Sequence, residues 1–183
     1  MTLPAPYQQL LQAFDALPGI GPRAAARLAQ FVISQPEGEQ LADAVRQARD
    51  GLRLCQRCFR YALQEECDSC RQPPPAPLLY VVASIDQVEP LEASGITSLF
   101  VLHGLLSPVA GTGPGQLHLP QLRTRVINES IEQLLLLLPD GVEADATACF
   151  ISDLLADLPV VTERRRMTDG SGRIRAETDD GAA

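Results

Sequence analysis

The sequence contains no lysine, so all 15 of its basic residues are arginine. The glycine-rich segment Gly111–Gly115 therefore lacks the lysine of a phosphate-binding P-loop and is not a nucleotide-binding signature. Only two histidines occur, His103 and His118, and neither has a metal-ligand partner at a recognisable spacing. We expect both histidines to be structural.

Long hydrophobic segments are also missing. The longest run of leucines is Leu134–Leu138, and no apolar run approaches the roughly 20 residues that a membrane-spanning helix needs. The opening MTLPAPYQQL has no basic segment and no long apolar segment, which argues against a secretory signal. Because 45% of the residues are hydrophobic, a packed core is expected and a wholly disordered chain is excluded. We expect a soluble, cytoplasmic protein.

The net charge of −8 is unevenly distributed along the chain. Residues 1–72 hold eight arginines and eight acidic residues, whereas residues 73–183 hold seven arginines and fifteen acidic residues, so the second part carries the whole excess (7 − 15 = −8). This asymmetry predicts modules with different partners. Only the first part could present a cationic surface to phosphate.

Three amphipathic helices are predicted before the first cysteine. Apolar residues recur every three or four positions over 3–17, 22–34 and 39–52. The first two helices flank Leu17-Pro-Gly-Ile-Gly-Pro-Arg23, in which Pro22 suits the first position of a helix.

This short segment between the helices could hold a phosphate group. Gly19 and Gly21 permit a tight turn that lets backbone N–H groups approach an anion, and the next helix adds its positive dipole end. Arg23 and Arg27 lie four residues apart and share one face of that helix. The alternative is an ordinary glycine-containing turn. The pattern resembles the helix-hairpin-helix element of DNA-binding proteins that do not read sequence.

Cys55, Cys58, Cys67 and Cys70 form two Cys-x2-Cys pairs separated by eight residues. This spacing predicts a tetrahedral Zn²⁺ site with four thiolates and no open position, hence a structural metal. A redox pair or two disulfides are the alternatives, and a cytoplasmic chain disfavours both. Cys149 lies in a helical apolar pattern, and we expect it to be a small buried residue.

The proline-rich segment 73–77 is predicted to be an extended linker, and the pattern beyond it is that of an α/β domain with a mainly parallel sheet. We expect strands at 78–82, 99–102, 133–138 and 159–161, and helices at 85–94, 119–126 and 143–157. Pro90 interrupts the first of these helices. The predicted domains are thus 1–53 (helix-hairpin-helix), 54–72 (zinc finger), 73–77 (linker), 78–162 (α/β) and 163–183 (flexible tail).

Glu143 and Asp145 open the last of these helices. Paired carboxylates at the carboxyl edge of a sheet could hold Mg²⁺, although they also suit the first turn of any helix. Catalysis would need a third carboxylate after the strand at 78–82, where the sequence has Ala83. This absence argues against an enzyme.

In this order, the motifs resemble the RecR family of bacterial recombination mediators. The resemblance rests on the Leu-Pro-Gly-Ile-Gly-Pro-Arg hairpin, the four cysteines, the segments Leu102–Pro108 and Gly111–Pro114, and the acidic turn Val142–Ala148. It covers residues 3–160 and implies an α+β multi-module protein whose α/β domain is of the Toprim type.

The resemblance implies a non-catalytic DNA-repair protein associated with the nucleoid. Such proteins form ring-like homo-oligomers on gapped DNA and act with RecO, and in many bacteria RecF, to load RecA. By this resemblance Arg23 and Arg27 contact phosphates, the four cysteines bind zinc, and Glu143 and Asp145 belong to the face that meets RecO.

Three departures from the family pattern keep other functions open. The carboxylate after the first Toprim strand is Ala83, an Asn-Pro is replaced by Pro139-Asp140, and the closing subunit-joining block is absent from residues 162–183. One alternative is a Mg²⁺-dependent Toprim-type nuclease or nucleotidyl transferase. The other is a diverged scaffold that binds proteins and no longer binds DNA.

Overall fold

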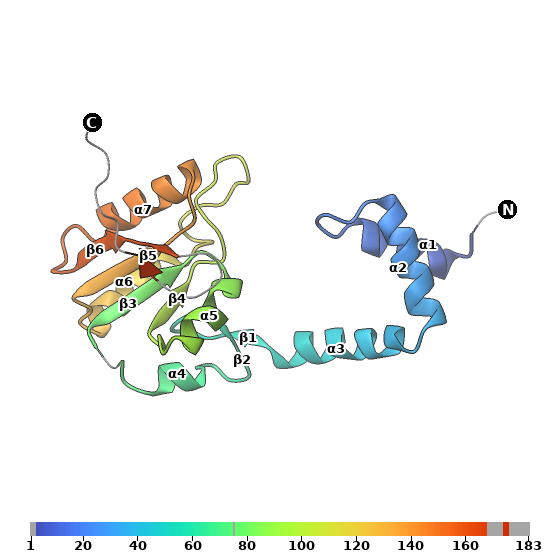
Figure 1. Cartoon of the computed structure of the whole chain (residues 1–183), viewed down its shortest axis with the longest axis horizontal. Coiled ribbons are helices and arrows are strands. Elements are labelled where there is room, and N and C mark those ends of the chain that lie inside the picture. Colours follow the sequence, from blue (N-terminus) through green and yellow to red (C-terminus); the bar gives the residue numbers. More distant parts are fainter. Residues whose placement is uncertain (1–2, 75, 168–173, 176–183) are drawn as a thin grey trace. The chain divides into compact units, whose positions relative to one another are not determined.

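A computed structural model describes residues 3–74, 76–167 and 174–175 of the chain. The chain forms two compact units, Met1–Leu52 and Arg53–Ala183 (Figure 1). The four cysteines therefore fold with the α/β part of the chain. The five-part division expected from the sequence stays a prediction. Across the described residues, no helix is both long enough and apolar enough to span a bilayer.

The first unit consists of three helices. They are α1 (Ala5–Asp15), α2 (Pro22–Ser34) and α3 (Glu37–Gly51). Helix α1 packs on α2, where Ala25 and Ala29 are buried, and these small side chains let the two helices approach closely. Gly38 is required where α3 begins against α2, because a Cβ at this position would lie 1.9 Å from the carbonyl oxygen of Val32.

The second unit contains the remaining elements. A small antiparallel pair, β1 (Arg53–Leu54) and β2 (Tyr61–Ala62), is followed by the short helix α4 (Asp68–Arg71). The sheet strands are β3 (Leu78–Val82), β4 (Leu99–Val101), β5 (Gln133–Leu137) and β6 (Val161–Arg164). The helices between them are η1 (Ile85–Gln87), α5 (Val88–Ala93), α6 (Leu119–Asn128) and α7 (Val142–Leu154). Beyond the sheet, β7 (Arg166–Met167) pairs with β8 (Ile174–Arg175).

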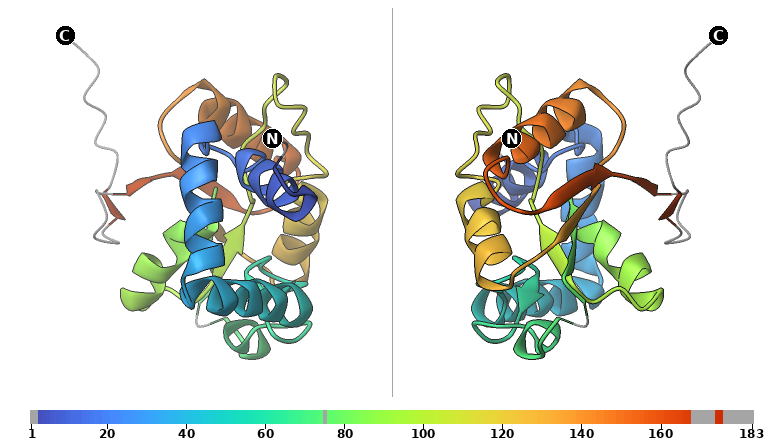
Figure 2. Two further views of the ribbon diagram at one scale, coloured as in Figure 1. Left: turned by 90° about the vertical axis from the view of Figure 1, so that its right-hand side faces the viewer. Right: turned by 90° about the vertical axis from the view of Figure 1, so that its left-hand side faces the viewer.

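The four-stranded sheet is parallel throughout, with the order β4-β3-β5-β6. Because β4 and β5 flank β3 on opposite sides, the chain reverses its direction of winding there and its helices cover both faces. Helix α5 lies on one side of the sheet, and α6 and α7 lie on the other (Figure 2). In such sheets ligands bind beyond the carboxyl ends of the strands where the winding reverses, here between β3 and β5.

The two faces of the sheet bury different amounts of apolar surface. The face below α6 and α7 holds the larger core, in which Leu79, Phe100 and Leu136 are fully buried. The face below α5 holds a smaller cluster around Leu91 and Leu137. Successive side chains along a strand point to opposite faces of the sheet. Because both faces are buried here, the strand sequences are apolar without interruption.

The predicted fold class is confirmed: an N-terminal helix-hairpin-helix, a four-cysteine segment and an α/β domain with a mainly parallel sheet. Several local details differ from expectation. The single helix expected at 85–94 is divided into η1 and α5, with Pro90 in the first turn of α5, where no N–H is needed. The last strand is Val161–Arg164 rather than 159–161, and α7 ends at Leu154 rather than at 157.

The expectation that Cys149 is buried is wrong, since its side chain is exposed. Helix α7 buries Ala144, Thr147 and Ile151, and Cys149 lies outside this face. Of the predicted tail, residues 168–173 and 176–183 lie outside the described residues, as does Pro75 of the predicted linker.

Candidate functional site

The hairpin between α1 and α2 is the first candidate site. The turn closes through the N–H of Ile20, which donates to the carbonyl oxygen of Leu17 over 3.1 Å. Gly19 adopts φ = +77°, a left-handed conformation that favours glycine, and Gly21 forms the N-cap of α2. No other group lies within 4 Å of the Cβ position at either glycine, so the backbone here is open to a ligand.

Both hairpin arginines are available for binding. Arg23 and Arg27 are exposed, and within the described part of the chain neither forms an ion pair. Arg23 lies in the first turn of α2, where backbone N–H groups have no partner within the helix. The helix dipole adds positive potential at the same end. This end of α2 therefore offers an anion two guanidinium groups and N–H groups that have no partner within the helix.

The four cysteines lie together, as their spacing predicts. Their Sγ atoms are all within 4.8 Å of one another, and no other group of three or more possible ligand residues meets this condition among the described residues. Thiolates bound at 2.3 Å around a tetrahedral ion lie about 3.8 Å apart, so the cluster fits a metal of this kind. Cys55, Cys58 and Cys70 are buried and Cys67 is partly exposed.

The sulfur atoms receive hydrogen bonds from the surrounding backbone and from Arg60. The N–H of Cys67 donates to Cys55 Sγ over 3.4 Å, and Arg60 Nε donates to Cys58 Sγ over 3.2 Å. A hydrogen bond with Cys70 and the contact with Arg60 lower the pKa of the Cys58 thiol to about 4, against the opposing effect of burial. The same hydrogen bond, together with burial, raises the pKa of Cys70. The shared hydrogen bond thus favours the thiolate form of Cys58 and the thiol form of Cys70.

The first cysteine loop is fixed to the α/β domain through three consecutive carbonyl groups. Arg125 Nη1 donates to the carbonyl of Arg57, the N–H of Val101 to that of Cys58, and His103 Nε2 lies 2.6 Å from that of Phe59. The donors come from α6, β4 and the loop after β4. The loop is thus joined to the edge strand β4 by one backbone hydrogen bond and to neighbouring elements by two side chains.

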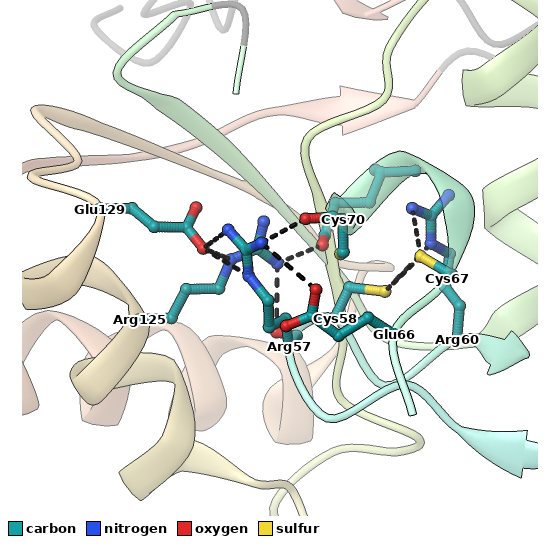
Figure 3. A network of polar contacts seen from close by, with 9 residues as sticks. Arg57, Cys58, Arg60, Glu66, Cys67, Cys70, Arg125 and Glu129 are labelled. Carbon is teal, nitrogen blue, oxygen red and sulfur yellow. Dashed lines mark hydrogen bonds and ion pairs between the residues drawn. The ribbon is translucent and has the colours of Figure 1, made fainter. Parts of the chain in front are cut away.

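An Arg–Glu–Arg group lies beneath the same loop (Figure 3). Arg57 from the loop and Arg125 from α6 both donate to Glu129 Oε1, over distances of 2.7 and 3.0 Å. Arg57 also donates to the carbonyl oxygen of Cys70. The carboxylate of Glu129, the C-cap residue of α6, therefore holds Arg57, which lies within the first cysteine pair and bonds the second.

The two histidines pack against Phe59 and against each other. The ring of His118 stacks on that of Phe59 with a centroid distance of 3.9 Å, and His103 packs edge-on at 6.3 Å from His118. Both histidines adopt left-handed backbone conformations. Burial and the neighbouring His103 lower the pKa of His118.

The carboxyl edge of the sheet does not assemble a carboxylate cluster from the described residues. Ala83 is buried after β3, and the N–H groups of Ala83 and Ser84 are both bound by Gln87 Oε1. Asp145 pairs with Arg164 of β6, whereas Glu143 is exposed at the start of α7. The expected third ligand of a Mg²⁺ site is thus replaced by an apolar side chain, and one of the two expected ligands already has a cationic partner.

The sequence does not predict several residues that contact the cysteine site. Arg60 lies between the cysteine pairs, yet its distance from the sulfurs depends on the loop conformation. Arg125 of α6 and Glu129, the C-cap residue of that helix, are four residues apart, a spacing that also occurs in ordinary exposed ion pairs. Their burial and their contact with Arg57, 72 residues from Glu129, become evident only in the folded chain.

Together, the fold and its sites define a class of protein in which a helix-hairpin-helix unit precedes a four-cysteine α/β unit. Comparison with known proteins agrees with this class. A family model described as "RecR, helix-hairpin-helix" matches residues 7–49. The Recombination protein RecR of Cutibacterium acnes is 34% identical over 164 residues, which cover 87% of this chain and 82% of the relative.

Two further relatives give the same result. The Recombination protein RecR of Parasynechococcus marenigrum is 40% identical over 152 residues, 80% of this chain and 79% of the relative. That of Alcanivorax borkumensis is 38% identical over 161 residues, 85% of this chain and 80% of the relative. The chain belongs to the RecR family.

Proposed function

We propose that this protein is a recombination and repair mediator that binds DNA through the α1–α2 hairpin without reading its sequence. The observation that carries the proposal is a pair of exposed arginines, Arg23 and Arg27, which have no ion-pair partner among the described residues and lie beside the open N-terminus of α2. Gly19 and Gly21 give a phosphate group access to the backbone there. Contacts of this kind position a protein on DNA and carry no base information.

The four cysteines are proposed to bind structural Zn²⁺. Four thiolates fill a tetrahedral shell and leave no position for substrate, so the metal would hold the loop and take part in no reaction. On this proposal the protein has no catalytic step of its own. It acts with RecO, and with RecF where present, to load RecA on gapped DNA, as part of a homo-oligomer.

The acidic start of α7 is proposed as part of the surface that meets RecO. Glu143 is exposed and free of ion pairs among the described residues, whereas Asp145 would have to exchange Arg164 for a partner. Glu143 is therefore the stronger of the two candidates for a direct contact.

DNA binding is tested by measuring the affinity for gapped DNA of unrelated sequences over a range of salt concentrations. We expect similar affinities for all sequences and loss of binding by about 0.5 M salt, because phosphate contacts release counterions. In Arg23→Ala/Arg27→Ala the slope of log affinity against log salt should decrease by about 2, since each phosphate contact contributes about 0.9.

The matched control is Arg46→Ala/Arg49→Ala, which removes the same charge from α3 of the same unit. Equal losses in the two double variants would show that only net charge matters and would contradict a hairpin site. Binding of RecO by a protein that ignores DNA would favour the scaffold alternative. Mg²⁺-dependent cleavage that disappears in Glu143→Ala would favour an enzyme.

A further inference from the structure

One arginine in the cysteine segment has no role in the metal ligation or in the DNA contacts proposed above. Arg60 is only 5% exposed, although it carries a full positive charge. A buried charge is costly unless it is paired and hydrogen-bonded, so its partners should account for its position.

The partners of Arg60 are two of the four sulfur atoms and one carboxylate. Its Nε atom donates to Cys58 Sγ over 3.2 Å, and its Nη2 atom donates to Cys67 Sγ over 3.4 Å. One guanidinium therefore bridges a sulfur atom from each Cys-x2-Cys pair (Figure 3). Its remaining nitrogen, Nη1, pairs with Glu92 of α5.

The charge of the proposed metal site explains why a cation lies there. Four thiolates around one divalent ion carry a net charge of about −2, and the site is largely buried, where charges interact more strongly than in water. A guanidinium presents several N–H donors in a planar fork, so it can bond two sulfurs at once. Arg60 thus supplies both a compensating charge and two hydrogen bonds.

The site is open on the side of Cys67. A groove of about 390 Å³ runs beside it, lined by Arg60, Tyr61, Cys67 and side chains of α5. Chelators and electrophiles can reach the cluster from this groove. Arg60 forms part of its wall and donates to the sulfur that is most accessible.

We propose that Arg60 is a positioning residue of the metal site: by bonding Cys58 and Cys67 it holds both as thiolate ligands, slows metal release and protects them from electrophiles. The inference rests on zinc binding by the four cysteines. Groups that orient metal ligands from outside the first shell typically change metal affinity by about 10- to 100-fold when removed. We expect a change of this size.

The experiment uses the full chain, loaded with zinc and checked for metal content and for secondary structure by circular dichroism. The rate of zinc transfer to a chromophoric chelator is measured for Arg60→Gln and Arg60→Lys. We expect release about 10- to 100-fold faster in Arg60→Gln, and partial recovery in Arg60→Lys, which keeps the charge and loses the fork. Arg71→Gln is the matched control, because Arg71 follows Cys70 directly and bonds Gln64 and Asp68 instead of sulfur.

A second readout separates an effect on sulfur from a loss of packing. In the Co²⁺-loaded protein, removal of the Arg60 charge should make the thiolates more electron-rich and move the sulfur-to-cobalt charge-transfer band to longer wavelength. The band should stay in place in Glu92→Ala, which cuts the link to α5 and leaves both sulfur contacts.

The outcomes are distinct. If Arg60→Gln releases zinc as slowly as Arg71→Gln, or if Glu92→Ala reproduces its fast release and band shift, Arg60 does not act on the sulfurs and the inference is wrong. A wild-type chain that binds neither zinc nor cobalt would overturn the proposed metal site together with this inference.

Discussion

Replacement of Arg125 by methionine tests how the cysteine loop is attached to the α/β domain. Arg125 is 8% exposed and the Glu129 side chain is 10% exposed, so the pair is almost fully removed from water. The substitution leaves the Leu99 carbonyl, 2.7 Å from Arg125 Nη1, without this donor, and it removes one of the two arginines at Glu129.

The expected cost follows from these contacts. An unsatisfied buried acceptor costs about 1–3 kcal/mol. The Glu129 carboxylate keeps Arg57 and bears a further cost of similar size, so we expect Arg125→Met to destabilise the domain by about 3–5 kcal/mol, as for other broken buried ion pairs. With a urea m-value of about 2 kcal/mol/M, the midpoint should fall by about 2 M.

The measurement is urea unfolding followed by far-ultraviolet circular dichroism, since the sequence has no tryptophan to report by fluorescence. Arg123→Met is the matched control: Arg123 lies on the same helix, and its partner Asp157 is at the surface. Arg125→Met/Glu129→Leu should recover part of the loss, because an apolar pair leaves no buried charge. A midpoint for Arg125→Met equal to that of Arg123→Met would refute the reasoning.

Two further predictions concern metal and pH. Removal of zinc by a chelator should raise the rate of amide hydrogen exchange in residues 55–71 and leave β5 protected, because the loop has little apolar core of its own whereas the sheet is buried. Mass spectrometry measures the exchange in each region. Equal loss of protection in the loop and in β5 would contradict a local role for the metal. The second prediction follows from the lowered pKa of His118. Because the unfolded chain binds a proton at this imidazole more readily than the folded chain does, the free energy of unfolding should decrease as the pH falls through 6.5. His118→Asn, which suits the left-handed backbone, should flatten this dependence in denaturant titrations between pH 5.5 and 7.5, and an unchanged slope would speak against His118 as the group responsible.

The hairpin and the cysteine cluster could be predicted because each depends on residues close together in the chain. Pro18, Gly19 and Pro22 mark the turn between two amphipathic helices, and the Cys-x2-Cys spacing brings two sulfurs to one point without help from the rest of the fold. The parallel sheet follows from apolar strands separated by helices. These patterns act locally or repeat along the chain.

Other features depend on packing between distant elements and could not be predicted. Helix α7 has apolar residues around much of its circumference, so its sequence could not indicate that Ile151 faces the sheet while Cys149 is exposed. Similarly, Arg164 is the first of three consecutive arginines, and nothing in that run indicates that Arg164 ends β6 and pairs with Asp145. Its position depends on the register of β6 against β5.

The two proposed sites lie in different compact units of the chain, so DNA affinity and zinc release can be altered separately. The hairpin belongs to the unit that ends at Leu52, and the cysteines belong to the unit that begins at Arg53. Effects at sites that share no partners usually add. A substitution at Arg23 should therefore alter DNA affinity without changing zinc release, and one at Arg60 should do the reverse. On these proposals, phosphate binding and metal retention depend on different arginines and can be altered one at a time.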